Sequence, residues 1–500
     1  MNDERRSLKN KQMSEEDYLV RATVTVEGSQ IEGIPCKVFL PERIEQKPYI
    51  VFKPSMEEFF QITKSYKCEL NAIISGFDKS KEVTIESPEV YFSGSSIRNW
   101  GGDLSEYNIP GEPQDLHVIR HLKGSRDEKD TEVVLWISPN KLLTPFTSRS
   151  SSYTGELKYK RVRNVEFLMR GKNHLAFEQH FRSKTTENGD LVQWSFLVAC
   201  LKTKISADNA TRLKQSILPD IDDFLLIASF GSRYRTACLG WHSGDQNSYT
   251  KFYRGNYSFP KFSEDQDIDS GLVAPEDFED FVHICYSEFL KFENKLALRD
   301  AINSLLPLQS NTLETSFLKL FSGLEALVLN FRRSNDLEFV LQQNEWSSLK
   351  KYIKKCIKRS TQPTLQPEQR ASLYRKLDEL NRVSLREAFN LFCEQYSIEL
   401  WDLWPVFSND EYVGLVEIRN RLSHGDSMTR DTISALVVAK QHLQFILERI
   451  IVVVLKWDIE KTKVRPSYLR EHMTAIQNMP AERKKISAAE STKLKSEDKK

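Results

Sequence analysis

Cysteine is scarce in this sequence of 500 residues, and the cysteines are not closely spaced in pairs. The seven cysteines include no CxxC pair. A disulfide framework or a zinc ribbon requires closely spaced cysteine pairs, so neither organises this chain. We therefore expect reduced thiols, as in a cytoplasmic protein. They stand at positions 36, 68, 200, 238, 285, 356 and 393.

Long apolar runs and an excess of one charge are also missing. The most apolar segment, 446–457, contains the charged residues Glu448, Arg449 and Lys456 and is far shorter than the ~20 residues that span a bilayer. The first 18 residues are charged throughout, so we expect no secretory signal and no membrane association. Lys plus Arg is 71 against 70 for Asp plus Glu. With this balance, a nucleic-acid function would need a local binding site.

The first half of the chain has mainly the period of two that strands with one buried face require. Val20, Ala22 and Val24, for example, alternate with polar residues. Only 207–217 and 220–230 look helical. We predict a β-rich domain over 17–265, built as two packed sheets or an open barrel. Its predicted strands include 36–40, 49–53, 82–85, 90–94, 132–138, 192–201 and 235–241.

Helical periodicity replaces this pattern after the polar segment 263–271. Apolar residues from Phe278 to Leu296 follow one another at spacings of three and four, which predicts one helix. Ser384 with Glu387, and Ser408 with Glu411, have the spacing of capping boxes that begin two later helices. The predicted fold class is therefore α+β, with an all-helical domain over 272–458. Its helices are expected at 278–296, 312–332, 336–358, 366–380, 384–396, 408–424 and 429–457.

Both ends of the chain lack this periodicity. Residues 1–16 are predicted to be a flexible N-terminus. Residues 461–500 hold 11 Lys or Arg against 5 Asp or Glu, with few large apolar side chains. This composition predicts a mobile basic tail over 459–500.

The segment EIRNRLSHGD, 417–426, is the most informative stretch for chemistry. It places Arg419, Asn420 and His424 at the end of a predicted helix, which Gly425 would stop. A helix C-terminus stabilises a protonated imidazole, so His424 can donate a proton. Imidazole acid–base chemistry and a guanidinium that binds phosphoryl oxygens suit cleavage of RNA by its own 2′-hydroxyl, which needs no metal.

The spacing of an arginine and a histidine alone is weak evidence for a catalytic motif. Arg465 and His472 have a related spacing, but Pro466 follows that arginine in place of an asparagine, and we reject this match. His117 and His121 are spaced HxxxH within a predicted strand and have no third ligand. We therefore expect no metal site and no cofactor.

The context of the motif resembles the HEPN domains. The resemblance rests on RNRLSHG ahead of a long apolar helix and on the preceding helix SFLKLFSGLEALVLN, 316–330. The order of a β-rich domain before the helical domain is similar to that of the ApeA-type HEPN proteins of bacterial anti-phage defence. In HEPN ribonucleases an Arg-polar-x3-His motif is catalytic, which implies that role for Arg419, Asn420 and His424.

The resemblance also implies a biological role. Two chains would form a homodimer through their helical domains, and this cytoplasmic endoribonuclease would cut tRNA or other cellular RNA, leaving 2′,3′-cyclic phosphate and 5′-hydroxyl ends. The outcome would be abortive infection, with a phage protein as the trigger at the β-rich domain. HEPN folds also serve as non-catalytic adaptors or RNA-binding modules in defence or toxin–antitoxin complexes, and that alternative stays open.

Two charged residues are expected to support the motif. Glu325 lies at the edge of the apolar face of its helix, where it can pair with Arg419 or Arg421. An ordinary half-exposed glutamate is an equally good interpretation. Arg421 is expected to contact solvent or an RNA phosphate.

Overall fold

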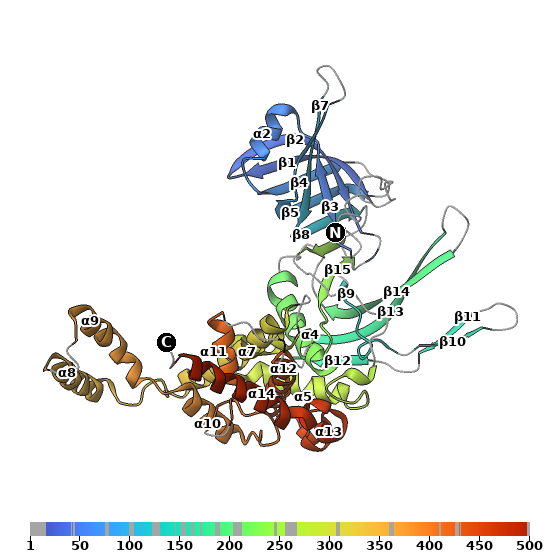
Figure 1. Ribbon diagram of the computed structural model, residues 1–500. Helices are drawn as coiled ribbons and strands as arrows, with labels where there is room; N and C mark the ends of the chain where they lie inside the picture. Colours follow the sequence, from blue (N-terminus) through green and yellow to red (C-terminus); the bar gives the residue numbers. More distant parts are fainter. Residues whose placement is uncertain are drawn as a thin grey trace. The chain divides into compact units, whose positions relative to one another are not determined.

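The computed structural model divides the chain into two compact units, Met1–Ser270 and Gly271–Lys500 (Figure 1). The first is rich in strands and the second is helical, so the predicted α+β class is confirmed. The predicted flexible segment 1–16 lies outside the described residues. The structure describes residues 17–497 except 42, 44–45, 76–79, 100–104, 123–130, 146, 152–156, 162–164, 171–172, 186–190, 204–212, 245–247, 256–267, 307–310, 360–364, 410–411, 426–429 and 431.

A closed six-stranded barrel opens the first unit. Its strands are β1 (Tyr18–Val26), β2 (Ser29–Phe39), β3 (Tyr49–Phe52), β4 (Lys67–Ser75), β5 (Ser80–Phe92) and β7 (Ser105–Pro113). They follow the order β5-β4-β1-β2-β3-β7, and β7 pairs again with β5, which closes the ring. Ala22 and Val24 are buried as their alternation predicted. A closed barrel therefore replaces the predicted open barrel or pair of sheets, because β7 pairs with β3 on one side and with β5 on the other.

A twisted sheet continues from the barrel through β8 (Asp115–Leu122). The order is β8-β16-β15-β9-β14-β13-β12, and α4 (Leu218–Ser232) packs on it through Phe224, whose ring lies 4.8 Å from that of Phe167. The other elements are β6 (Ser96–Asn99), β9 (Thr131–Ile137), β10 (Thr147–Ser151), β11 (Leu157–Arg161), β12 (Val165–Met169), β13 (Asn173–Thr185), β14 (Leu191–Thr203), β15 (Cys238–Gly244), β16 (Ser248–Arg254), η3 (Leu213–Ile217) and η4 (Ile268–Ser270).

One short helix of this unit was not predicted. Helix α2 (Met56–Ile62) begins with a capping box in which Ser55 accepts from the Glu58 N–H and the Glu58 side chain accepts from the Ser55 N–H. Phe59 and Ile62 are its buried residues. The Ser-x-x-Glu spacing is the signal that the sequence analysis missed.

The second unit is a helical bundle around α12, whose central residues are almost all buried. Helix α12 packs against α6, α7 and α14. The elements are α5 (Phe278–Lys291), α6 (Lys295–Leu305), α7 (Leu313–Ser334), α8 (Gln343–Arg359), α9 (Pro367–Lys376), η5 (Leu377–Asn381), α10 (Leu385–Tyr396), α11 (Leu415–Ser423), α12 (Ile433–Val454), η6 (Ile459–Lys461), α13 (Pro466–His472) and α14 (Thr474–Glu497).

The predicted helix boundaries at residues 296 and 336 are wrong. The predicted helix 278–296 ends at Lys291, and Asn294 begins the next helix by accepting from the Ala297 N–H at 3.2 Å. The helix predicted from residue 336 begins only at Gln343, because Asp336 has a positive φ of 55°. In the first case a side-chain cap begins a new helix, and in the second a left-handed residue delays the helix start, although the spacing of apolar residues favours a continuous helix in both.

The predicted mobile tail is also wrong for most of its length. Helices α13 and α14 occupy it, and the side chains of Leu469 and Ile486 are fully buried in the bundle. A few well-spaced apolar residues are sufficient to dock a basic segment, which bulk composition does not detect. Of the helices in the described ranges, none has the length and apolar character needed to cross a bilayer.

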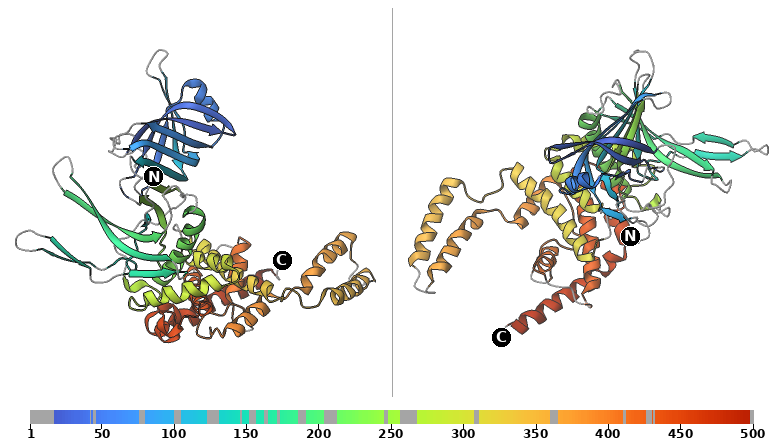
Figure 2. Two further views of the ribbon diagram at one scale, coloured as in Figure 1. Left: turned by 180° about the vertical axis from the view of Figure 1, so that it is seen from behind. Right: turned by 90° about the horizontal axis from the view of Figure 1, so that it is seen from above.

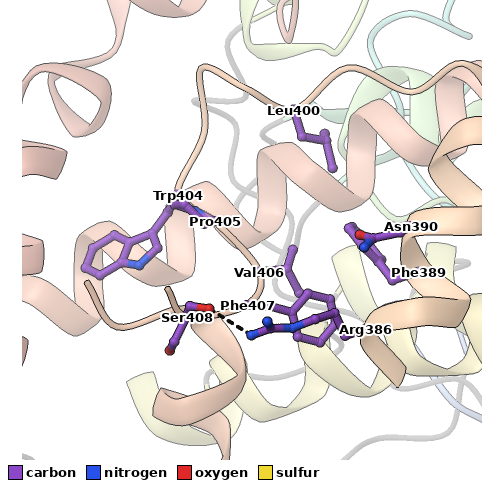
Figure 3. Close-up of a pocket in the computed structure, with 9 residues that line it drawn as sticks. All are labelled: Arg386, Phe389, Asn390, Leu400, Trp404, Pro405, Val406, Phe407 and Ser408. Atoms are coloured by element: carbon purple, nitrogen blue, oxygen red, sulfur yellow. Dashed lines mark hydrogen bonds between the residues drawn. The ribbon is translucent and has the colours of Figure 1, made fainter. Parts of the chain in front are cut away.

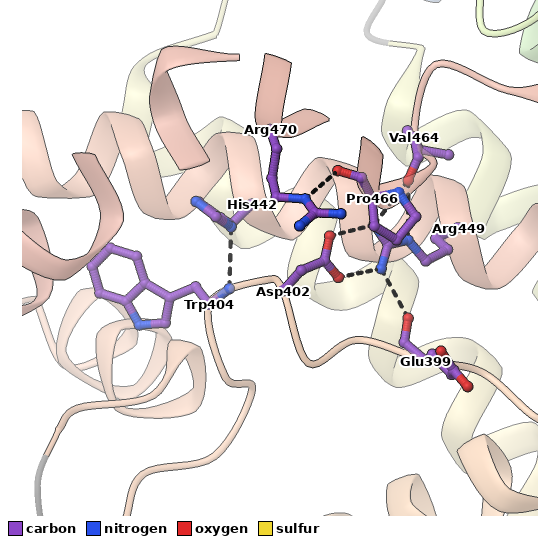
Figure 4. Close-up of polar contacts among 8 residues, drawn as sticks. All are labelled: Glu399, Asp402, Trp404, His442, Arg449, Val464, Pro466 and Arg470. Atoms are coloured by element: carbon purple, nitrogen blue, oxygen red, sulfur yellow. Dashed lines mark hydrogen bonds and ion pairs between the residues drawn. The ribbon is translucent and has the colours of Figure 1, made fainter. Parts of the chain in front are cut away.

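A buried polar network fixes the loop before α11 to α12 (Figure 4). Arg449 on α12 forms a bidentate ion pair with Asp402, with N–O distances of 2.6 and 2.9 Å. Its guanidinium also donates to the backbone carbonyls of Glu399 and Val464. Only 1% of the Arg449 side chain and 3% of the Asp402 side chain are exposed.

His442, also on α12, is buried beside this network. Its Nδ1 accepts from the Trp404 N–H at 3.1 Å, and its Nε2 lies 3.1 Å from the Ala475 carbonyl, so the neutral ring carries its proton on Nε2. Burial lowers the pKa of His442 from 6.5 to about 4. The neutral imidazole therefore belongs to the folded state.

This lowered pKa predicts a loss of stability in acid. The unfolded chain binds a proton at His442 near pH 6.5 and the folded chain only near pH 4, so the stabilisation is complete above pH 6.5 and declines as the pH falls towards 4. The loss approaches about 3 kcal/mol. Urea unfolding at pH 7 and pH 5 measures it, and His442→Gln should reduce this pH dependence. Equal pH dependence in both proteins would contradict the assignment.

Candidate functional site

Helix α11 carries the predicted motif, and the preceding loop holds its first turn. The N–H groups of Leu415 and Val416 donate to the carbonyls of Pro405 and Val406 at 3.1 and 2.9 Å. The Gly414 N–H donates to Ser408 Oγ at 2.7 Å. A Cβ on Gly414 would lie 2.4 Å from the backbone carbon of Phe407, so only glycine fits there.

This geometry corrects the predicted start of the motif helix. Ser408 caps no helix at 408, because its hydroxyl is used by Gly414 and α11 begins at Leu415. Glu411, the other half of the predicted capping box, lies outside the described residues. The shorter helix has Gly414 at its N-cap and buries Leu415 and Ile418, which anchor it in the bundle.

The end of α11 agrees with the sequence prediction. His424 is the C-cap residue, and its N–H donates to the Asn420 carbonyl at 3.0 Å. Gly425 follows with a φ of +83°, the left-handed conformation that ends many helices. The motif side chains thus occupy the last turn of α11 and the residue just beyond it.

Arg419 is held by three neighbours. Its Nη2 donates to both carboxylate oxygens of Glu325 at 3.0 and 3.2 Å, and its Nη1 donates to Asn420 Oδ1 at 3.1 Å. The guanidinium carbon lies 5.9 Å from the ring centre of Phe321, one turn before Glu325 on α7. The predicted ion pair of Glu325 is confirmed, and its partner is Arg419. These contacts orient the guanidinium while 35% of the side chain remains exposed.

His424 differs from Arg419 in having no fixed partner. Its side chain is exposed, and its imidazole makes no hydrogen bond or ion pair with any residue in the described part of the chain. On an ideal helix Arg419 and His424 lie about 7.5 Å apart along the axis and about 140° apart around it, so only the long Arg419 side chain can bring its guanidinium towards the imidazole.

Arg421 lies on the same helix but outside this arrangement. It is half-buried, and its Nη1 is buried with no hydrogen-bond partner among the described atoms. Glu325 pairs with Arg419 and leaves Arg421 to other contacts. The structure therefore does not bring Arg421 into the Arg419–Asn420 cluster.

A pocket of about 310 Å³ adjoins the loop that holds α11 (Figure 3). Helix α10 and residues 400–408 line it. At its wall, Arg386 donates to the Ser408 carbonyl at 2.7 Å, and its guanidinium carbon lies 5.3 Å from the Phe407 ring centre. None of the motif residues lines this pocket. The pocket is therefore separate from the motif residues.

Within the described ranges, one group of side chains in the β-rich unit has the geometry to hold a metal ion. Ligand atoms of Glu178, His180 and Cys200 all lie within 4.8 Å of one another. His180 Nε2 lies 3.1 Å from Glu178 Oε2, so an ordinary hydrogen bond accounts for two of the three positions. His117 and His121 lie on strand β8, as predicted, and are not part of this group.

Sequence reasoning identified the motif and Glu325 but missed Phe321 and Gly414. Phe321 had a readable signal, because it precedes Glu325 by four residues and so shares its helix face. The sequence contains no such signal for Gly414, because the close approach of Phe407 depends on tertiary structure. No family model, curated protein or solved structure matches this chain. Functional inference therefore depends on the geometry of these residues.

Proposed function

We propose that the helical unit is a metal-independent endoribonuclease with Arg419, Asn420 and His424 as its active-site residues. One observation carries the proposal. A guanidinium oriented by Glu325 and Asn420 lies five residues before an exposed imidazole that has no hydrogen-bond partner among the described residues. The resemblance of the motif and its flanking helices to HEPN ribonucleases supports the same assignment.

Arg419 stabilises charge on the phosphate. A guanidinium has five N–H donors, and three hydrogen bonds join it to Glu325 and Asn420. At least two donors remain for a phosphoryl oxygen. Because the side chain is already oriented, little conformational freedom is lost when the phosphate binds. Glu325 and Asn420 act here as positioning residues.

His424 transfers the protons. The 2′-oxygen of the RNA attacks the adjacent phosphorus and loses its proton, while the bond from phosphorus to the 5′-oxygen breaks and that oxygen gains a proton. The products are a 2′,3′-cyclic phosphate and a 5′-hydroxyl. One imidazole supplies one of the two transfers. The same residue of a second chain supplies the other in a symmetric homodimer.

Exposed apolar residues close to the motif support such a dimer. Ile433 and Val437 are 47% and 41% exposed on the first turns of α12, although both are large and apolar. They are four residues apart and share a helix face. We infer that a second copy covers this face, which follows the motif along the chain.

The biological role follows from the resemblance. This cytoplasmic enzyme would cut tRNA or other cellular RNA when a phage protein engages the β-rich unit, and the arrest of growth would limit the phage. The β-rich unit is then the sensor and the helical unit is the effector. The alternative, a non-catalytic adaptor, is favoured by the Glu325–Arg419 pair if that pair only stabilises the bundle.

Cleavage of RNA in EDTA tests the proposal. We expect the purified full chain, alone or with lysate from phage-infected cells, to cut total RNA in EDTA and to leave ends that T4 polynucleotide kinase can label without prior phosphatase treatment. Such labelling requires a 5′-hydroxyl. RNA that stays intact under every condition, or ends that carry 5′-phosphates, would support the adaptor.

A further inference from the structure

A helical arm projects from the bundle between α7 and α10 (Figures 1 and 2). We define the arm as residues 338–383, which contain α8, α9 and η5. Its two ends meet in a short antiparallel bridge between Phe339 and Arg382. The Val340 N–H donates to the Asn381 carbonyl at 2.8 Å, and the Val383 N–H donates to that of Glu338 at 3.1 Å. The arm therefore leaves the bundle through a hydrogen-bonded base.

The arm has its own ordered packing. The Trp346 Nε1–H of α8 donates to Asp378 Oδ1 at 3.0 Å, and Lys350 pairs with the same carboxylate at 2.5 Å. Farther along, the Lys354 ammonium lies 5.7 Å from the ring centre of Tyr374 on α9. These contacts fix α8 against the return segment, so the arm presents its outer surface in a defined orientation.

That outer surface is strongly basic. Residues 343–382 contain ten Lys or Arg against four Asp or Glu, in a chain whose net charge is only +1. Lys351, Lys355 and Lys358 of α8 are exposed and make no hydrogen bond or ion pair with a described residue. Their spacing places them on one helix face, at steps of about 6 and 4.5 Å along the axis. An array of unpaired cations at such steps suits a polyanion.

The apolar residues of α8 indicate which polyanion it fits, an anionic lipid surface or a nucleic acid. Trp346 is buried within the arm, and Ile353 and Ile357 are half-buried. Of the large apolar side chains of α8, which is described in full, only Leu349 and Tyr352 are exposed, at 40% and 66%, and the other exposed apolar residues of the arm, Phe339, Val340, Leu373 and Leu380, lie outside α8. Helix α8 therefore does not present the continuous apolar face that interfacial helices insert into a lipid surface. Tyr352, however, is 66% exposed beside the lysine row. A free aromatic ring next to phosphate-binding lysines is the arrangement on which unpaired bases stack.

The arm also lies close to the proposed active site along the chain. It begins just after α7, the helix that carries Glu325 and Phe321. From Glu325 to the end of α7 at Ser334 the helical rise is about 14 Å. We therefore expect an RNA molecule bound along the arm to extend past its base to Arg419.

We propose that the α8–α9 arm binds the RNA substrate, with Lys351, Lys355 and Lys358 on its phosphates and Tyr352 stacked on an unpaired base. This inference rests on the proposed ribonuclease function, because it assigns that active site its substrate contact. It locates the site of RNA binding that the balanced overall charge of the chain does not indicate.

Binding of an uncleavable RNA tests the arm separately from catalysis. A fluorescein-labelled, single-stranded 2′-O-methyl RNA lacks the attacking hydroxyl, and its anisotropy reports binding to the full chain. We expect K351E/K355E/K358E to weaken binding by roughly tenfold or more, and to reduce the slope of log affinity against log salt by about 2. The neutral K351Q/K355Q/K358Q should give a smaller loss in the same direction.

A matched control removes the same charge elsewhere. Lys47, Lys64 and Lys484 are exposed lysines outside the arm, and K47E/K64E/K484E should keep the wild-type affinity. Equal losses in the arm and control variants, wild-type binding by the arm variants, or binding only to vesicles that contain phosphatidylserine would overturn the proposal.

The two proposals fail in different ways. If the wild-type chain cleaves RNA and the arm variants bind RNA normally, the proposed role of the arm is wrong and the proposed nuclease function stands. If RNA binding depends on the arm but no condition gives cleavage, the proposed nuclease function is wrong and the proposed role of the arm stands.

Discussion

Replacement of His424 by alanine is expected to slow RNA cleavage by about 10²–10⁴-fold, the usual contribution of a general acid or base. The imidazole is exposed and makes no hydrogen bond within the described part of the chain. Its loss therefore leaves no buried group without a partner, and the melting temperature should not change. Single-turnover cleavage of a labelled RNA, together with a thermal unfolding curve, measures both effects.

His472 provides a matched control for this substitution. It is also an exposed histidine of the helical unit, with 55% of its side chain accessible, and it belongs to the rejected second match at 465–472. His472→Ala should cleave RNA at the wild-type rate. Wild-type cleavage by His424→Ala would remove His424 from the mechanism.

Changes at Arg419 should separate charge from geometry. Arg419→Lys keeps the positive charge but loses the planar guanidinium, which donates to Glu325 through Nη2 and to Asn420 through Nη1. We expect a loss of about 10²–10³-fold in cleavage, as for removal of one preorganised donor. Glu325→Gln keeps one acceptor for Arg419 and should lose less. If the glutamate only positions the guanidinium, part of the cleavage rate that Glu325→Gln loses should also be recovered at high RNA concentration.

Removal of the buried Arg449 side chain is expected to destabilise the helical unit by about 3–5 kcal/mol. Arg449→Ala leaves the Asp402 carboxylate buried without a counter-ion and frees the carbonyls of Glu399 and Val464. Urea unfolding followed by tryptophan fluorescence measures the change, because Trp404 lies two residues from Asp402 and is fully buried.

A double variant and a surface control complete this experiment. Arg449→Met with Asp402→Leu removes both charges together, so it should recover a large part of the lost stability. Lys485→Ala removes the surface ion pair with Glu482 and a hydrogen bond to Ser434 Oγ, and it should cost less than about 1 kcal/mol. If Arg449→Ala were no more destabilising than Lys485→Ala, the network would have no structural role.

The sequence predicts best where local chemistry determines the structure. The helix N-cap at Ser384 and the stop at Gly425 were correct, because a side-chain cap and a left-handed glycine act within one turn of the chain. The period of two identified many of the barrel strands for a similar reason. The ion pair of Glu325 was anticipated from its place on a helix edge, although only the structure distinguishes Arg419 from Arg421 as its partner.

The remaining features depend on contacts between distant segments. Closure of the barrel requires β7 to pair with β5, and the local alternation in either strand does not encode that pairing. The start of α11 is set by Phe407 and Ser408 against Gly414, and the final helices dock through a few residues such as Ile486. The basic arm is visible as charge in the sequence, but its packing through Trp346 and Asp378 is not.

The narrow base of the arm has an evolutionary consequence. Because the Val340 N–H and the Asn381 carbonyl are 2.8 Å apart, the chain enters and leaves the arm at almost the same point. Segments with adjoining ends can be lengthened, exchanged or deleted while the surrounding core keeps its connectivity. The arm can therefore diverge between relatives, and change which molecules they recognise, while the residues around Arg419 and His424 stay the same.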